Sequence, residues 1–178
     1  LATRGKPHVP HLVRRVKDAQ TRGVQRVRSP ALPDLPVAKE HIEAVIAGMA
    51  DVPRAGTARQ PFEGVRYSVA GKTGTAQVFT VAQNKTYDAS KLARNRHDHG
   101  LFIAFAPVDR PQIAVAVLCE NGGFGAKSAA PIARKMLDYW LLGENRLGLE
   151  PPRHVQARSA AAARKAGDKA GAERSGKP

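Results

Sequence analysis

The stretch "GLFIAFAPVDRPQIAVAVLCEN", residues 100–121, decides the fold of this chain. Two apolar runs flank the short segment "PVDRP", which predicts an antiparallel hairpin with a turn bounded by prolines. Both runs are apolar at consecutive positions and not only at alternate ones. Strands with this pattern are covered on both faces. We therefore expect both strands of the hairpin to lie centrally in a sheet with helices on either side.

Helical patterns precede and follow this hairpin. In "VAKEHIEAVIAGMA", residues 37–50, apolar residues recur at helical spacing and predict a helix over residues 38–49. The apolar positions of this helix are Ile42, Val45, Ile46 and Met49. Residues 51–64 are rich in turn formers and are predicted to be loop. The order helix, strand, hairpin, helix indicates an α+β fold, an antiparallel sheet flanked by helices.

The last helix is predicted in "AKSAAPIARKMLDYWLLG", residues 126–143. Ser128 is placed to cap its start and Gly143 to end it. Its apolar positions form two adjacent rows. These positions are Ile132, Met136 and Trp140, with Ala133, Leu137 and Leu141 beside them.

The two ends of the chain differ in composition. Near the start, "PHVPHLVRRVKD" predicts a short strand over residues 9–16, followed by a proline-rich connector. The body, residues 1–150, has enough apolar residues for a core. Residues 151–178 form an Ala-, Lys-, Arg- and Gly-rich segment without aromatic residues, which cannot offset the entropy of ordering. We expect that segment to be a disordered basic tail.

The charge of the chain does not by itself identify a partner. The formal net charge of +14 is shared between tail and body, without a basic stripe interleaved with aromatic residues. No nucleic-acid partner is therefore expected. A solvated tail near an anionic membrane or cell-wall polymer explains the charge equally simply. His97 and His99 flank Asp98, but no further ligand clusters with them, so neither a metal nor another cofactor is expected.

A polar motif interrupts the strand predicted in "SVAGKTGTAQVF", residues 68–79. Its centre, Lys72-Thr73-Gly74-Thr75, has a cation, two hydroxyls and a glycine where a strand would normally have side chains that pack. This makes sense for a strand at the edge of a sheet, where free backbone groups can pair with an extended peptide. Gly74 would allow close approach, the hydroxyls and ammonium suit a carboxylate, and a backbone N–H can stabilise an oxyanion. A solvent-facing lysine between threonines is the simpler alternative for these four residues alone.

The wider sequence resembles the penicillin-binding proteins and serine β-lactamases. "AGKTGTAQVF" is similar to their third active-site motif, and "RHDHGLFIAFAP", "IAVAVLCENGG" and "AAPIARKMLDYWL" follow in the order that this family uses. "VPHLV", a helix and "AGTA" precede the motif. The resemblance covers nearly everything but the tail and implies the C-terminal portion of a transpeptidase domain of that fold. It is strongest to the elongation-specific class B enzymes, penicillin-binding protein 2, with the division-specific class B enzymes as the alternative.

The resemblance implies a D,D-transpeptidase that cross-links D-Ala-D-Ala stem peptides of peptidoglycan through a serine acyl-enzyme and is acylated by β-lactams. By motif position, the resemblance implies that Lys72 maintains the protonation state and the charge balance of the active-site cleft. The hydroxyls of Thr73 and Thr75 would bind the substrate carboxylate. The Thr75 backbone N–H would be an oxyanion donor, worth about 3 to 4 kcal/mol in comparable sites. Gly74 has no side chain and would leave room for the substrate.

Two motifs of this family are missing from the chain. None of the serines has Lys three residues later or Asn two residues later, so neither Ser-x-x-Lys nor Ser-x-Asn is present. The serines are Ser29, Ser68, Ser90, Ser128, Ser159 and Ser175. We expect both motifs upstream of Leu1, and we expect the chain alone to be inactive. The alternative is a non-catalytic module that binds peptide or cell wall through the same edge strand.

Partners and localisation follow from the resemblance alone. It implies a polymerising glycosyltransferase and a scaffold of the elongation machinery as partners, at the periplasmic face of the bacterial inner membrane. The chain has no run of about 18 apolar residues and begins at Leu1 rather than Met. We therefore expect a fragment whose targeting and anchoring segment lies upstream.

Overall fold

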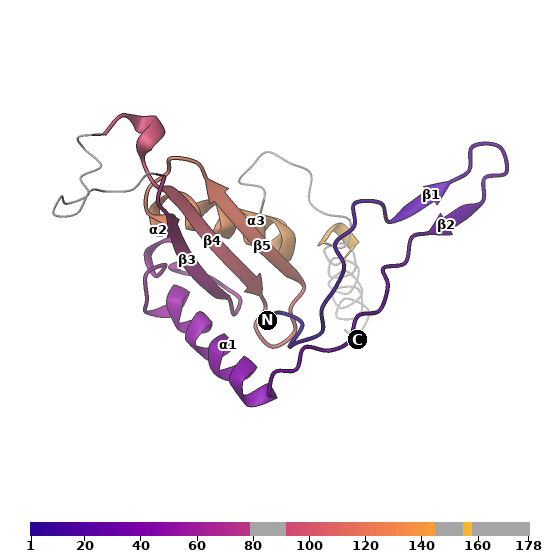
Figure 1. The fold of residues 1–178 in the computed structure, drawn as a ribbon, viewed down its shortest axis with the longest axis horizontal. Coiled ribbons are helices and arrows are strands. Elements are labelled where there is room, and N and C mark those ends of the chain that lie inside the picture. The colour runs from indigo at the N-terminus through magenta and orange to yellow at the C-terminus, as the bar shows by residue number, and fades with distance from the viewer. Residues whose placement is uncertain (79–91, 145–154, 158–178) are drawn as a thin grey trace, which may run out of the picture. The chain divides into compact units, whose positions relative to one another are not determined.

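The computed structural model describes residues 1–78, 92–144 and 155–157 of the chain (Figure 1). The chain divides into two compact units, Leu1–Ala47 and Gly48–Pro178. The first contains a small hairpin and the start of a long helix. The second contains a three-stranded sheet with helices packed on it. Of the predicted tail, residues 155–157 are helical, and the remainder lies outside the described residues.

The hairpin of the first unit differs from the predicted strand. β1 (Arg15–Lys17) pairs antiparallel with β2 (Val24–Arg26), and all six residues are exposed. The strand predicted over residues 9–16 is therefore wrong for most of its length. A turn starting at Asp18, whose carboxylate accepts the N–H groups of Gln20 and Thr21, sets the position of the hairpin. Pairing starts well beyond Pro10, which has no N–H to donate to a strand partner.

Helix α1 (Lys39–Arg54) confirms the helix before the motif but extends five residues further than predicted. Its last turn includes Pro53, so residues 51–54 are helical and not loop. Ile42, Ile46 and Met49 are buried, whereas half of the Val45 surface is exposed. The buried stripe is thus narrower than the apolar pattern indicated.

The sheet of the second unit contains β3 (Ala70–Ala76), β4 (His99–Ala106) and β5 (Ile113–Cys119), in that order and antiparallel (Figure 1). The predicted hairpin is β4–β5, with Ala106 opposite Ile113 and Gly100 opposite Cys119. Within the described residues β4 is central, as expected, but β5 is an edge strand. The expectation that β5 is covered on both faces is wrong for these residues, because Leu118 is 54% exposed whereas Val115 on the other face is buried.

A helical layer covers one face of the sheet. α2 (Gly125–Ser128) and α3 (Ala130–Leu142) lie behind the strands in Figure 1. α3 buries the row of smaller residues, Ala133 and Leu137, and leaves exposed the row Ile132, Met136 and Trp140. Alanine on the inner face lets the helix approach the sheet closely, which the apolar pattern alone did not reveal.

The predicted ends of the last helix were half right. Gly143 ends α3 in the left-handed conformation with φ of 72°, and its N–H donates to the Tyr139 carbonyl. Ser128 does not cap α3. It is the last residue of α2, and its hydroxyl donates back to the Phe124 carbonyl at 3.2 Å.

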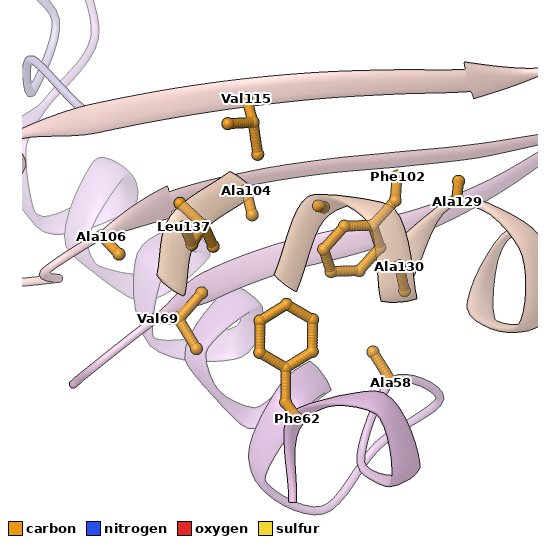
Figure 2. Close-up of a cluster of buried hydrophobic side chains, with 11 residues drawn as sticks. Ala58, Phe62, Val69, Phe102, Ala104, Ala106, Val115, Ala129, Ala130 and Leu137 are labelled. Carbon is orange, nitrogen blue, oxygen red and sulfur yellow. The ribbon is translucent and has the colours of Figure 1, made fainter. Parts of the chain in front are cut away.

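The core lies between the sheet and this helical layer (Figure 2). The short 3-10 helix η1 (Gln60–Phe62) carries Phe62 into it. The Phe62 and Phe102 rings lie 5.6 Å apart between centroids, in tilted contact. Ala58, Val69, Ala104 and Leu137 are buried around the two rings. No helix of the described ranges is long and apolar enough to cross a membrane.

A buried polar cluster ties α3 to the segment that precedes β3. The fully buried Asp138 carboxylate accepts a bond from the Tyr67 hydroxyl at 2.8 Å and two from Arg134 Nε, both at 2.8 Å. Arg134 also donates to the Glu63 carbonyl and lies over the Phe62 ring. Burial, followed by the bond to Asp138, raises the pKa of the Tyr67 hydroxyl far above its ordinary value. The cluster is satisfied only while α3 and this segment stay together.

We predict that Tyr67→Phe lowers the free energy of unfolding by about 1 to 3 kcal/mol, because a buried carboxylate loses a donor. Denaturant unfolding of the purified protein measures this loss. Asp51→Asn is the control, because it breaks an exposed ion pair with Arg54 that is worth at most about 1 kcal/mol.

The cost of Tyr67→Phe also depends on pH. Since the folded state raises the Tyr67 pKa, the stabilisation is complete below the pKa of an unfolded tyrosine and declines as the pH rises above about 10. The difference between the two proteins should therefore shrink in alkaline solution. A cost that is small at neutral pH, or that grows above pH 10, would contradict this account of the cluster.

Candidate functional site

The predicted motif lies in the middle of β3, at an edge of the described sheet. Side chains alternate between the two faces of a strand. Thr73 and Thr75 therefore share the face on which Phe102 and Ala104 form the core, whereas Lys72 and Gly74 share the opposite face. The structure thus brings the two predicted carboxylate-binding hydroxyls together and places the ammonium across the strand from them.

Lys72 lies on the open face of the sheet. It stands opposite Ile103, whose side chain is 47% exposed, and is itself exposed. Its Nζ donates to the Thr73 carbonyl at 2.9 Å, so the side chain is folded along β3. An ammonium has three N–H groups, so this bond leaves two for a ligand.

Thr73 is the one motif residue that bonds a side chain from outside the strand in the described structure. Its Oγ1 lies 3.0 Å from Oγ1 of Thr57, in the turn that follows α1. From the sequence, "AGTA" was only part of a predicted loop and of the family resemblance. The pairing of the two hydroxyls was missed, because 16 positions separate them along the chain.

Glycines pack the backbone tightly around the centre of the motif. A Cβ on Gly125, the first residue of α2, would lie 2.7 Å from the Gly74 carbonyl oxygen and closer still to that of Leu101. A Cβ on Gly74 would itself meet the Leu101 Cβ at 3.3 Å. Gly74 therefore has a reason for lacking a side chain within the fold, besides the predicted clearance for a substrate. The sequence pattern did not indicate this contact, because Gly74 and Gly125 lie far apart along the chain.

Thr75 lies opposite Gly100 and is exposed. A Cβ on Gly100 would collide with the Ser128 hydroxyl and lie 2.8 Å from the Gly123 carbonyl oxygen. The loop and α2 thus press against β4 directly beside Thr75. In a strand the backbone groups of residues two apart point the same way, so the Thr75 N–H points to the same side as the Thr73 carbonyl that Lys72 reaches.

The three serines of the described ranges, and the histidines beside the start of β4, have structural partners. Ser29 donates to the Val9 carbonyl, Ser128 to that of Phe124, and Ser68 accepts the Val108 N–H. His99 Nδ1 accepts the Asn121 N–H at 2.9 Å, which joins the start of β4 to the turn after β5. No group of three metal-ligating side chains occurs in the described part of the chain. Tyr87 and Lys91 are polar residues of the segment between the motif and the hairpin and are further candidates for substrate contacts from the sequence, but they lie outside the described residues.

A cavity of about 460 Å³ opens beside the start of β3 but is not this site. Its lining comes from the end of α1, from η1 and from the residues before β3, and includes Phe62, Tyr67 and Val69. None of the four motif residues lines it. The candidate site is therefore the exposed edge of β3.

Comparison with known proteins identifies the family. Residues 1–138 match the family model of the penicillin binding protein transpeptidase domain. The chain belongs to this family, and the expected α+β fold and the likeness to class B penicillin-binding protein 2 are confirmed. The peptidoglycan D,D-transpeptidase MrdA of Haemophilus influenzae is 41% identical over 145 residues, which are 79% of this chain and 22% of that protein.

Solved structures agree with this assignment. The crystal structure of Pseudomonas aeruginosa PBP2 in complex with WCK 5153 superposes with a TM-score of 0.60 and 34% identity, over 81% of this chain and 29% of that one. The complex between PBP2 and MreC from Helicobacter pylori gives a TM-score of 0.52 and 27% identity, over 64% and 20% of the chains. The chain thus spans less than a third of the length of these relatives.

Because Gly125 of α2 lies against the backbone of β3 and β4, we predict that Gly125→Ala disturbs the candidate site. A methyl group there must displace the backbone of β3 or β4, which should lower the melting temperature by several degrees. Differential scanning calorimetry of the purified protein measures the shift. Gly48→Ala is the matched control, because a Cβ at that exposed position in α1 meets nothing within 4 Å and should leave stability equal or slightly higher. Equal melting temperatures for both variants would contradict the tight contact.

Proposed function

We propose that this chain supplies the substrate-binding edge strand of a peptidoglycan D,D-transpeptidase. The observation that carries the proposal is the position of the motif. In the sheet that the structure describes, β3 is an edge strand. It exposes Lys72 and Thr75 and holds the hydroxyls of Thr73 and Thr75 on one face. The proposed reaction is supported by the family assignment and by the similarity to relatives named peptidoglycan D,D-transpeptidase.

In the proposed complex a stem peptide ending in D-Ala-D-Ala lies along the edge of β3 as an added strand. The hydroxyls of Thr73 and Thr75 donate to its terminal carboxylate. The Thr75 N–H donates to the carbonyl oxygen that becomes an oxyanion when the penultimate D-Ala is attacked. Gly74 leaves room for the peptide backbone. β-Lactams carry a carboxylate and a reactive carbonyl in a similar arrangement and would occupy the same positions.

Lys72 would supply positive charge where negative charge develops. Its exposed ammonium is held at β3 by one bond to the Thr73 carbonyl. Two N–H groups remain to stabilise the substrate or to take part in proton transfer. The nucleophilic serine and its lysine are proposed to come from residues that this sequence does not include. By itself the chain should therefore neither bind penicillin covalently nor turn over substrate.

The wider assignments rest on the relatives. The complex of Helicobacter pylori PBP2 with MreC supports a scaffold protein as a partner. We further propose a polymerising glycosyltransferase as a partner, and a location at the periplasmic face of the inner membrane through a membrane anchor outside this sequence. We further propose that residues 1–150 belong to the transpeptidase domain, since the family model matches residues 1–138, and that the basic residues 151–178 form a tail beyond it.

We predict that Lys72→Ala in the full-length protein slows acylation by a fluorescent penicillin by about 100-fold or more, as expected for loss of a group that assists proton transfer. The rate is measured from the labelled band over time after gel electrophoresis. Lys135→Ala is the matched control, because it removes an exposed lysine from α3, away from the motif. Both variants should melt as the unchanged protein does. A normally folded Lys72→Ala variant with unchanged acylation would contradict the proposed function.

The same label separates this proposal from a non-catalytic binding module. An antibody against residues 1–150 and fluorescent penicillin should detect one band in cell extract, much larger than the 19.1 kDa of this chain. Detection of only a small, unlabelled protein by the antibody would favour the binding module.

A further inference from the structure

Among the described residues, Thr57 is the one outside β3 whose side chain hydrogen-bonds a side chain of the motif. Its Oγ1 lies 3.0 Å from Oγ1 of Thr73, a distance within the range of a hydroxyl–hydroxyl hydrogen bond. Both side chains belong to the unit that contains the sheet. Thr57 is not part of the Lys-Thr-Gly-Thr motif.

The backbone on both sides of Thr57 is fixed. The Gly56 N–H donates to the Asp51 carbonyl at 3.0 Å, and the Ala58 N–H donates to the Val52 carbonyl at 3.1 Å. A Cβ on Gly56 would lie 2.9 Å from the Val52 Cα, so only glycine fits there without a shift. Ala58 is fully buried in the core. Thr57 is therefore presented to β3 by a turn that is anchored on α1 on one side and in the core on the other.

The direction of the hydrogen bond follows from the chemistry of the ligand. A hydroxyl has one hydrogen to donate and can accept further bonds, whereas a carboxylate only accepts. When Thr73 donates to a substrate carboxylate, it has no hydrogen left for Thr57. Thr57 must then donate to Thr73, and a hydroxyl that accepts such a bond is polarised and becomes a better donor.

We propose that Thr57 is a positioning residue for the carboxylate site, and this inference rests on the proposed function. Thr57 donates to Thr73 Oγ1 and thereby both fixes the Thr73 rotamer and directs its hydrogen toward the ligand carboxylate. The fixed Gly56–Ala58 backbone makes this orientation part of the fold before the ligand arrives. Thr57 does not touch the ligand, so it acts only through Thr73.

The test compares Thr57→Val, Thr57→Ser and Thr73→Val, and the double Thr57→Val/Thr73→Val variant, in the full-length protein. Valine keeps the shape of threonine and removes the hydroxyl, and serine keeps the hydroxyl. The measured quantities are the penicillin dissociation constant before acylation and the limiting acylation rate. Thr57→Val should raise the dissociation constant by about 3- to 10-fold, the effect expected for one hydrogen bond, with little change in the limiting rate. Thr57→Ser should restore at least most of the binding.

Two further comparisons distinguish a positioning role from a merely structural one. In the Thr73→Val background, Thr57→Val should change binding less than 2-fold, because its effect passes through Thr73. With the same penicillin as its methyl ester, the effect of Thr57→Val should also largely disappear, since the carboxylate is gone. Thr3→Val, which removes an exposed hydroxyl bonded to the Lys6 carbonyl, is the control and should change neither constant.

Each contrary outcome has a definite meaning. Independent effects of Thr57→Val and Thr73→Val, an equal effect with acid and ester, or no rescue by serine would overturn the positioning role. Unchanged binding in a Thr57→Val variant that melts normally would do the same. In those cases the proposed function still stands if Lys72→Ala slows acylation as predicted above. If Lys72→Ala is acylated normally, the proposed function itself fails.

Discussion

The contact of Phe62 with Phe102 is the interaction on which the arrangement around the site depends. It packs η1, which precedes β3, against the central strand β4 at 5.6 Å between ring centroids (Figure 2). Arg134 reinforces the contact from α3, because it lies over the Phe62 ring and bonds both Asp138 and the Glu63 carbonyl. The turn that carries Thr57 lies just before η1 in the chain, so the same packing keeps this turn beside β3.

One face of the sheet packs against the core and the other is open, and the candidate site has side chains on both faces. Phe102 and Ala104 of β4 face the core, and Thr73 lies on that same face at the edge, where it meets Thr57. Lys72 lies on the open face beside Ile103. An edge strand allows this combination because its free side exposes backbone groups and is reached from both faces. The hydroxyl of Thr73, held by Thr57 on the core side, and the Lys72 ammonium on the open side both border this edge.

Much of the local structure was predictable from the chain alone. The β4–β5 hairpin, the helix before β3, the end of α3 at Gly143 and the motif in a strand all follow from apolar patterning and from turn chemistry. The errors concern which apolar residues are buried. α3 buries Ala133 and Leu137 and exposes Trp140, and β5 is open on one face within the described residues. Burial depends on what packs against an element, and a periodic pattern does not contain that information.

The sequence by itself determined the class of fold and the chemical groups of the candidate site, because spacing and residue type are local properties. Lys72, Thr73, Gly74 and Thr75 were identified as one motif on one strand. Tertiary structure alone decided that Thr57 meets Thr73 and that Gly125 presses against Gly74. These contacts join residues far apart in the chain, and they form only when η1, α2 and the sheet pack into a common core.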